Sequence, residues 1–400
     1  MDDFRPQVEA LAELVVGFAA NVQPDQLVAV LSEPGKENLT RAVAEAAYRR
    51  GARFVDVWYF DQLVKRARIR YAPEDTLDYV PPWWGERAER LSELGAARIA
   101  LEGPAAPGAL DDLDPHKAGL DRMPRLAEIG PIVNARTTNW TSAPAPTRAW
   151  AELVYPDLDS DAAYGKLWDE IRHVCRLDEP DPAAAWTRRM AELTDVGNRL
   201  GALRLDALHF EGPGTELTIG LLPSSKWISA EFTRRDGLRH LVNVPSEEVF
   251  TTPDPERVDG TVRATLPLEH VGSIIRGIEV RFEHGRAVSI DAERGGEVLR
   301  TATSRDDGAA RLGEVALVDR AGRIGPLGTV FYDTLLDENA ASHIAFGSAY
   351  SFTIDEADQA RANTSAIHID FMIGSNDVAV TGIMRSGDEI PLLRGGDWQI

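Results

Sequence analysis

The stretch Asp337–Ser375 carries the residues around which the rest of this chain is interpreted. It opens with D-E-N-A-A-S-H-I-A-F-G-S-A-Y (337–350) and closes with N-T-S-A-I-H-I-D-F-M-I-G-S (363–375), with a short acidic loop between the two segments. The second segment places His368 and Asp370 two residues apart inside an apolar run. Residues i and i+2 of a β-strand lie on the same face. The spacing therefore predicts an imidazole and a carboxylate that project together from one strand.

The first segment supplies a second histidine together with polar neighbours. His343 follows Glu338 closely, and Tyr350 comes seven residues after His343, on the same face if the segment is helical. Burying so many polar groups among apolar residues costs on the order of several kcal/mol unless a partner compensates for the lost water. A metal ion is the simplest such partner, so we interpret the whole stretch as a candidate metal site.

Length and composition indicate a globular protein of two domains. The 400 residues are more than a single hydrophobic core usually supports. The apolar fraction of 44% and the charged fraction of 27% are typical of globular proteins in water. A net charge of −21 argues against binding to nucleic acid or to an anionic membrane surface, because both need clustered Lys and Arg.

Cysteine content and targeting signals bear on the compartment. The single cysteine, Cys175, excludes an internal disulfide and a thiolate metal cage. The first residues lack the basic and apolar regions of a signal peptide. No apolar run reaches the ~18 residues of a membrane-spanning helix. We therefore expect a reduced, cytoplasmic protein.

The first half of the chain has the pattern of an α/β domain. The apolar run Leu27–Leu31 is typical of a strand buried on both faces, and it is followed by a helical pattern over Leu39–Arg50 and a strand that ends near Phe60. A strand, a helix and a strand with short joins predict a parallel pair, and a second such unit runs through 86–101. No glycine-rich nucleotide loop follows the first strand, which disfavours a dinucleotide site.

The character of the sequence changes near Gly201. Before that point, 139–186 is rich in tryptophan and proline, which we interpret chiefly as buried tryptophans in a connector and secondarily as the lining of a cleft. Beyond it, alternating apolar runs separated by glycine turns predict strands. We therefore assign residues 1–200 to an α/β N-terminal domain and residues 201–400 to a β-rich α+β C-terminal domain that carries the metal site.

Two further acidic motifs lie outside the opening stretch. The segment N-V-P-S-E-E-V-F-T-T-P places Glu247 and Glu248 between a proline turn and an apolar pair. The segment R-L-G-E-V-A-L-V places Glu314 just before a strand-like run. Each glutamate alone is most simply a solvated surface charge, and His343 alone is more simply a core histidine than a ligand. It is their combination that indicates a metal site.

These motifs resemble those of the thermophilic-type metallo-aminopeptidases, the group of aminopeptidase T, aminopeptidase S and related leucyl aminopeptidases. The signatures of that family are similar to P-[TS]-E-E-V-[FY]-T, L-G-E-V-A-L, D-E-N-A-x-x-H-I-A-x-G-x-A-Y and N-x-S-x-x-H-x-D-F-M-I-G. All four occur in this order in the chain. The motifs are long and specific, and the resemblance covers essentially the whole chain.

The resemblance implies a hydrolase that removes the N-terminal residue from peptides with a free N-terminus, and it implies a homodimer. It assigns the metal ligands of the family to five residues, Glu248, Glu314, His343, His368 and Asp370. It assigns assistance in catalysis to Tyr350, while Glu338 matches a further acidic position, so that Tyr350, Glu314 and Glu338 are the candidate catalytic residues. The loop between Tyr350 and His368 is short and leaves the substrate preference open.

The chemistry of the residues agrees with this implication. Imidazole and carboxylate ligands without a thiolate suit Zn²⁺, Co²⁺, Mn²⁺ or Mg²⁺. Four carboxylates offer a formal charge of −4, which matches two divalent cations: Glu248, Glu314, Glu338 and Asp370. Two such ions about 3.5–4 Å apart can share and activate one water, while the second ion or Tyr350 stabilises the oxyanion. Glu314 is the best candidate for the shared carboxylate.

An alternative comes from another class of enzyme. His343, His368 and Asp370 also match the ligand set of a non-haem Fe(II) oxygenase, and ring-cleaving dioxygenases are similar in fold to this family. Because a single iron does not need the other glutamates, we favour the hydrolase over the dioxygenase and over an inactive, metal-stabilised protein. The remaining histidines lack comparable neighbours and are expected to be surface or structural residues: His116, His173, His209, His240, His270 and His284.

Overall fold

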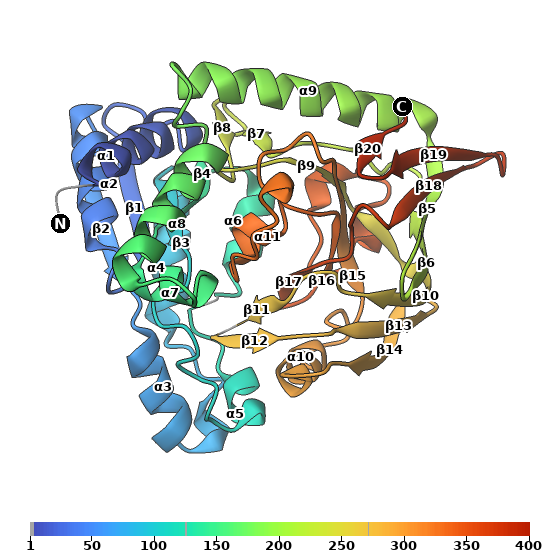
Figure 1. The fold of residues 1–400 in the computed structure, drawn as a ribbon, viewed down its shortest axis with the longest axis horizontal. Helices are drawn as coiled ribbons and strands as arrows, with labels where there is room; N and C mark the ends of the chain where they lie inside the picture. Colours follow the sequence, from blue (N-terminus) through green and yellow to red (C-terminus); the bar gives the residue numbers. More distant parts are fainter. Residues whose placement is uncertain (1–3, 125, 271) are drawn as a thin grey trace. The chain divides into compact units, whose positions relative to one another are not determined.

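The computed structural model describes residues 4–124, 126–270 and 272–400, and the chain forms two compact units (Figure 1). The first unit consists of the chain up to Lys117, then Asp121–Arg189 and Ala230–Ser246. The second consists of Ala118–Leu120, Met190–Ser229 and Glu247–Ile400. The predicted domain division after residue 200 stays a prediction, and the long helix α9 (Pro182–Leu203) continues through that point.

The first unit contains a parallel sheet. Its strands lie in the order β2-β1-β3-β4 and are β1 (Leu27–Ser32), β2 (Phe54–Tyr59), β3 (Ala97–Glu102) and β4 (Trp140–Pro144). All three pairings are parallel, which confirms the parallel pair predicted from the strand, helix, strand pattern. Buried and half-buried residues alternate along β1, so this strand is fully buried on one face only.

The remaining elements of the first unit are helices and one short strand pair. The helices are α1 (Arg5–Leu14), a π-helical turn (Val15–Ala19), α2 (Glu37–Arg49), α3 (Gln62–Tyr71), α4 (Pro82–Glu93), α6 (Ile129–Ala135), α7 (Arg148–Val154) and α8 (Ser160–Val174). The strand pair is β7 (Glu231–Thr233) with β8 (Arg239–Leu241). Helix α5 (Pro115–Leu120) spans the passage between the units. Trp150, Trp168 and Trp186 are fully buried, as the interpretation of the tryptophan-rich stretch expected.

An antiparallel sheet of eight strands forms one layer of the second unit. Its order is β14-β13-β10-β6-β5-β18-β19-β20. These strands are β5 (Leu205–Gly212), β6 (Thr215–Leu221), β10 (Pro253–Arg263), β13 (Glu279–Glu283), β14 (Arg286–Asp291), β18 (Ala379–Met384), β19 (Glu389–Arg394) and β20 (Asp397–Trp398). Strands β5 and β6 pair as an antiparallel hairpin, in the part of the chain where alternating apolar runs predicted strands. The unit also contains α10 (Gly296–Thr303), α11 (Thr334–Asp337) and the pair β11 (Leu268–His270) and β12 (Ser273–Ile275).

A smaller antiparallel sheet in the second unit has the order β17-β16-β15-β9. Its strands are β9 (Glu248–Thr251), β15 (Leu312–Val318), β16 (His343–Gly347) and β17 (His368–Met372). One face of this sheet is apolar: the ring of Phe346 lies 5.8 Å from that of Phe282 in β13 and 5.3 Å from that of Phe371. Among the described residues, no helix is both long and apolar enough to cross a bilayer.

Candidate metal centre

Every strand of the small sheet contributes a predicted ligand. These are Glu248 in β9, Glu314 in β15, His343 in β16, and His368 and Asp370 in β17. Across the sheet, Ala316 pairs with His343, and Ala345 pairs with Glu314 on one side and Asp370 on the other. Directly paired residues share a face of the sheet. The predicted ligands therefore project from the same face, opposite the phenylalanine core.

Small residues lie between the ligands on this face. Ala345 separates Glu314 from Asp370, and Ala316 lies between His343 and Phe250 in the cross-strand register. Because alanine carries only a methyl group, these two positions leave room on the ligand face for the longer side chains of their neighbours. This feature was not recognised in the sequence, because it depends on which strands pair and in what register.

A β-bulge at Gly313 separates the two faces of β15. Leu312 pairs with Phe346, whereas Glu314 pairs with the next residue, Ala345, so that the register shifts between them. The bulge turns Leu312 toward the apolar face while Glu314 stays on the ligand face. A Cβ atom at Gly313 would lie 2.3 Å from the carbonyl oxygen of Gly347, so only glycine fits.

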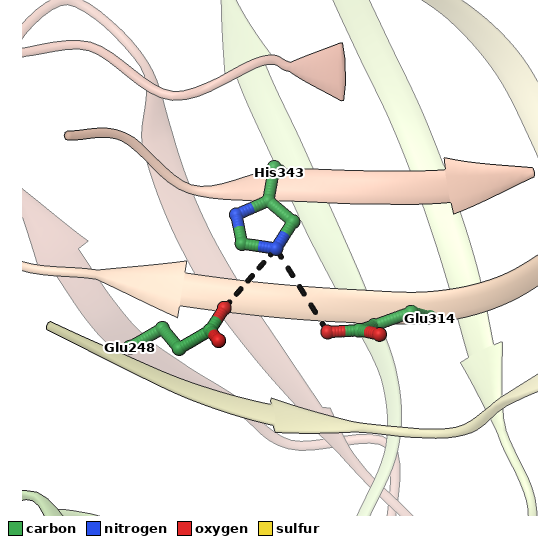
Figure 2. A group of neighbouring side chains, drawn as sticks. All are labelled: Glu248, Glu314 and His343. Carbon is green, nitrogen blue, oxygen red and sulfur yellow. Dashed lines mark ion pairs between the residues drawn. The ribbon is translucent and has the colours of Figure 1, made fainter. Parts of the chain in front are cut away.

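The imidazole of His343 faces two carboxylates (Figure 2). Its Nε2 lies 3.1 Å from Oε2 of Glu248 and 3.8 Å from Oε1 of Glu314. Its other nitrogen, Nδ1, donates a hydrogen bond to the carbonyl oxygen of Glu338 at 2.8 Å. This hydrogen bond fixes the ring and directs Nε2 toward the carboxylates, the orientation in which a histidine can ligate a metal through Nε2 once that nitrogen has lost its proton.

His368 repeats this arrangement on the edge strand β17. Its Nδ1 donates to the carbonyl oxygen of Ser348 at 2.8 Å, and its Nε2 lies 3.3 Å from Oδ1 of Asp370. The same Nε2 is 3.4 Å from Oε2 of Glu314. Glu314 thus turns one oxygen toward each imidazole.

The side chains form three overlapping groups, each with ligand atoms within 4.8 Å of one another. The groups are Glu248, Glu314 and His343; then Glu314, His368 and Asp370; and then Glu338, His343 and Asp370. The third group brings in Glu338, which the family resemblance matches to a further acidic position of the site. Glu247 belongs to none of the groups found among the described residues, since its side chain points away from the face that Glu248 uses.

Tyr350 lies beside the cluster, although no helix joins it to His343. The segment after His343 is strand β16 rather than a helix, so the helical spacing to Tyr350 does not apply. The tyrosine follows the strand and turns back, with its ring 5.4 Å from that of His368 and 5.6 Å from that of Phe250. Burial and then the nearby carboxylates raise the pKa of Tyr350 well above its usual value, so the phenol keeps its proton.

Concentrated negative charge governs the electrostatics of the cluster. Burial raises the pKa of Glu248 and Glu338, and the neighbouring carboxylates raise both values further. Burial lowers the pKa of the two imidazoles, but the adjoining carboxylates outweigh it, so the pKa values of His343 and His368 lie well above normal. Cations placed among these groups would take over the charge compensation that protons otherwise supply. The residues present therefore fit a divalent metal.

Solvent reaches the cluster from one side. The exposed fraction of the side chain is 1% for His343 and 6% for Glu248 and Glu314, but 27% for His368. The side chains of Glu248, Glu314 and His343 are therefore shielded from solvent, whereas the imidazole of His368 is partly accessible to it. The other six histidines lie outside the metal-ligand groups found among the described residues.

A mixed α/β fold with carboxylates and imidazoles gathered on one buried strand face defines a metal-dependent enzyme. The profile of the family described as Thermophilic metalloprotease (M29) matches residues 4–398. The chain belongs to this family, and its enzyme class is that of the metallo-aminopeptidases, which are hydrolases. The family resemblance inferred from the four motifs is confirmed.

Individual relatives are similar over their full length. Aminopeptidase T of Thermus thermophilus is 42% identical over 409 residues, with both chains covered completely. Aminopeptidase 2 of Geobacillus stearothermophilus is 35% identical, with 100% of this chain and 99% of the relative covered. The solved structure of wild-type AmpT from Thermus thermophilus superimposes with a TM-score of 0.88 over 99% of this chain and 100% of that one, at 40% identity. These similarities support the hydrolase and give no support to the dioxygenase alternative.

Proposed function

We propose that this metallo-aminopeptidase removes the N-terminal residue from peptides with the help of two divalent cations. The proposed ligands are Glu248, Glu314, His343, His368 and Asp370. The observation that carries the proposal is the position of Glu314, whose two oxygens face the Nε2 atoms of His343 and His368 at 3.8 and 3.4 Å. The five proposed ligands divide into two groups that share only Glu314, and each group contains one imidazole, so that each can hold one ion.

The cations, drawn from Zn²⁺, Co²⁺, Mn²⁺ or Mg²⁺, would supply Lewis-acid chemistry by lowering the pKa of a coordinated water and by polarising the peptide carbonyl. The chain contributes the frame for this chemistry. Hydrogen bonds from Nδ1 to backbone carbonyls orient both imidazoles, and burial keeps water away from the carboxylates near His343. The side of the cluster at His368, whose side chain is 27% exposed, is the proposed entry for the peptide.

Tyr350 is proposed to donate a hydrogen bond to the carbonyl oxygen of the substrate as negative charge develops there. Its ring lies against His368 on the open side of the cluster, where the scissile bond would arrive. A donor placed at this point stabilises the transition state more than the ground state. Glu338 is assigned to the same reaction centre, because its carboxylate lies in one group with His343 and Asp370.

Replacing the proposed bridging carboxylate tests this mechanism. In Glu314→Gln, the side chain keeps its shape but loses its charge and one ligand oxygen. We expect loss of at least one of two bound cations, and a fall of at least about 100-fold in kcat on an amino-acid p-nitroanilide, since Lewis-acid stabilisation is worth several kcal/mol. Metal content is measured by elemental analysis. The exposed Glu211→Gln is the matched control and should keep both cations and full turnover.

Several outcomes of this experiment would contradict the proposal. Wild-type turnover and full metal content in Glu314→Gln would mean that the site lies elsewhere. Metal-free wild-type enzyme should regain activity with Zn²⁺, Co²⁺ or Mn²⁺ equally under air and nitrogen, and acetylation of the substrate's α-amine should abolish cleavage. One iron per chain and a requirement for oxygen would instead favour the dioxygenase.

We also propose that the enzyme is a homodimer, in line with the family resemblance. The edge strand β2 supports the proposal, because its apolar side chains Phe54, Val57 and Tyr59 are 56, 36 and 40% exposed. Light scattering at micromolar concentration should give twice the 43.8 kDa of one chain, and a monomer mass would refute the dimer.

A further inference from the structure

A buried amide joins two of the segments that carry the proposed ligands. Asn339 is 0% exposed and follows Glu338 just beyond the end of α11. Its Oδ1 accepts a hydrogen bond from the backbone N–H of Glu247 at 2.7 Å. Its Nδ2 donates to the carbonyl oxygen of Leu335 at 2.9 Å. The side chain is therefore bonded at both ends, to the start of β9 on one side and to α11 on the other.

The two hydrogen bonds of Asn339 are adjacent in sequence to residues of the proposed metal centre. Glu247 immediately precedes the ligand Glu248, and Glu338 immediately precedes Asn339. The carbonyl oxygen of Glu338 also accepts the Nδ1 hydrogen bond of His343. The pair Glu338–Asn339 therefore fixes Glu338 itself, the ring of His343 and the backbone in front of Glu248. Glu338 and His343 belong to one segment of the chain, and Glu248 belongs to another.

Asn339 binds the backbone in front of β9 at the point where the chain passes from the first compact unit to the second. Ser246 is the last residue of the first compact unit, and Glu247 is the first residue of the returning second one. Glu248 is therefore only two residues beyond the passage, and it is the first residue of its strand. A buried hydrogen bond to the N–H of Glu247 fixes the backbone at the last point before the ligand.

We propose that Asn339 is a positioning residue of the metal centre, which holds Glu248 and the Glu338–His343 corner in one frame. The inference rests on the proposed ligand set, and it adds a residue that does not itself touch the cations. Partners that orient metal ligands in this way typically change metal affinity by about 10–100-fold when they are lost. Asn339 should therefore influence metal binding more than it influences folding.

The test compares two buried asparagines. In Asn339→Ala, both hydrogen bonds disappear. In the control Asn139→Ala, a fully buried amide of the first unit is removed, together with its hydrogen bond from Gln26 at 2.7 Å. Metal-free protein is titrated with Zn²⁺ or Co²⁺ by calorimetry, and its thermal unfolding is followed separately. Asn339→Ala should weaken binding of at least one cation by about 10–100-fold and lower kcat at saturating metal, with KM changed less than about twofold. Asn139→Ala should lose thermal stability but bind both cations like the wild type.

A second variant separates the two hydrogen bonds of Asn339. Asn339→Asp keeps an acceptor for the N–H of Glu247 but cannot donate to Leu335. It should lose thermal stability in the metal-free state and still bind the cations within a few fold of the wild type. An added carboxylate cannot weaken cation binding through its charge. If the aspartate variant loses affinity as far as the alanine variant does, the accepted hydrogen bond does not position the site and the proposal fails.

The outcomes distinguish this inference from the proposed function. Asn339→Ala that binds both cations as tightly as the wild type overturns the inference, while loss of metal in Glu314→Gln would still uphold the ligand set. If Asn339→Ala does not fold, the metal affinity of Asn339→Asp decides. Wild-type protein that binds no cation would overturn both.

Discussion

At the scale of single residues, an alanine between two proposed ligands limits the volume of the side chains in the metal centre. Ala345 lies between Glu314 and Asp370 in the cross-strand register, on the face that holds the cluster. Any larger side chain there would enter the space between two proposed ligands. The constraint therefore concerns volume rather than chemical type.

We predict that Ala345→Val reduces metal binding without unfolding the protein. The two added methyl groups force Glu314 and Asp370 apart, so the bound cations should fall from two per chain to one or fewer. Overpacking should cost about 1–3 kcal/mol of unfolding free energy. The control is Ile344→Val, which changes the apolar face of the same strand and should cost about 0.5–1.5 kcal/mol with full metal content. Elemental analysis and urea unfolding measure both quantities, and two cations in Ala345→Val would refute the prediction.

The ligands were predictable as residues, but their supports were not. His368 and Asp370 lie two apart in an apolar run, so a shared strand face followed directly from the sequence. Asn339 and Ala345 are fixed positions of the D-E-N-A-x-x-H-I-A motif, but the sequence gives no physical role for either one, because an asparagine in a loop or an alanine in a strand is unremarkable in itself. Their importance arises from hydrogen bonds and pairings between residues that are distant in sequence.

At the scale of elements, the bulge in β15 should be intolerant of any side chain. A Cβ atom at Gly313 would meet the carbonyl oxygens of Gly347 and Ser348 at 2.3 and 2.5 Å. We predict that Gly313→Ala separates β15 from β16, lowers the free energy of unfolding by about 1–3 kcal/mol or more, and displaces Glu314 so that turnover falls.

Another glycine provides the matched control for this prediction. Gly201 is exposed in α9, and a Cβ atom there would have no neighbour within 4 Å. Gly201→Ala should raise the free energy of unfolding by up to about 1 kcal/mol, because alanine favours the helix, and should leave turnover unchanged. Urea unfolding and peptide hydrolysis are measured on both variants. Equal stability and activity for Gly313→Ala and wild type would show that the bulge is dispensable.

Elements with local signals were predicted better than those without. The parallel sheet followed from short joins between strand and helix patterns, because βαβ units have few alternatives. Strand β16 is only five residues long and fully buried, so its sequence lacks an alternating pattern, and a helix was considered there. The order β17-β16-β15-β9 joins segments far apart in the chain, which no local pattern encodes.

At the scale of the whole molecule, the chain crosses between its compact units more than once. The segment Ala230–Ser246 belongs to the first unit although both flanking segments belong to the second. Within the first unit, the N–H of Ser142 donates to the carbonyl oxygen of Val242, and the N–H of Val244 donates to that of Ser142, so the segment extends the parallel sheet beside β4. The sequence pattern indicated a single boundary, near Gly201. The inserted segment was not recognised, because a few hydrogen bonds join it to the first unit and its composition does not set it apart.

This inserted segment carries a titratable group that ties stability to pH. His240 in β8 is 4% exposed, and its ring packs edge-on against Phe232 at 6.1 Å. Burial lowers the pKa of His240 to about 4, and the nearby charge of Arg234 acts in the same direction. In the unfolded chain the pKa of histidine is about 6.5. Between these two pKa values the imidazole is protonated in the unfolded state and neutral in the folded state, so lowering the pH favours unfolding.

We predict that His240 weakens the protein as the pH falls from about 6.5 to 4, and that His240→Leu removes this part of the loss. From the two pKa values, His240 lowers the free energy of unfolding by about 2 kcal/mol between pH 7.5 and pH 5. Well above the unfolded pKa it has no such effect, because the imidazole is neutral in both states. Urea unfolding of metal-free wild type and variant at both pH values gives the difference, which should shift by this amount in favour of the variant. The control is the same replacement at His284, which removes an imidazole whose side chain is 97% exposed. Parallel profiles for wild type and His240→Leu would mean that the buried imidazole takes up its proton without unfolding.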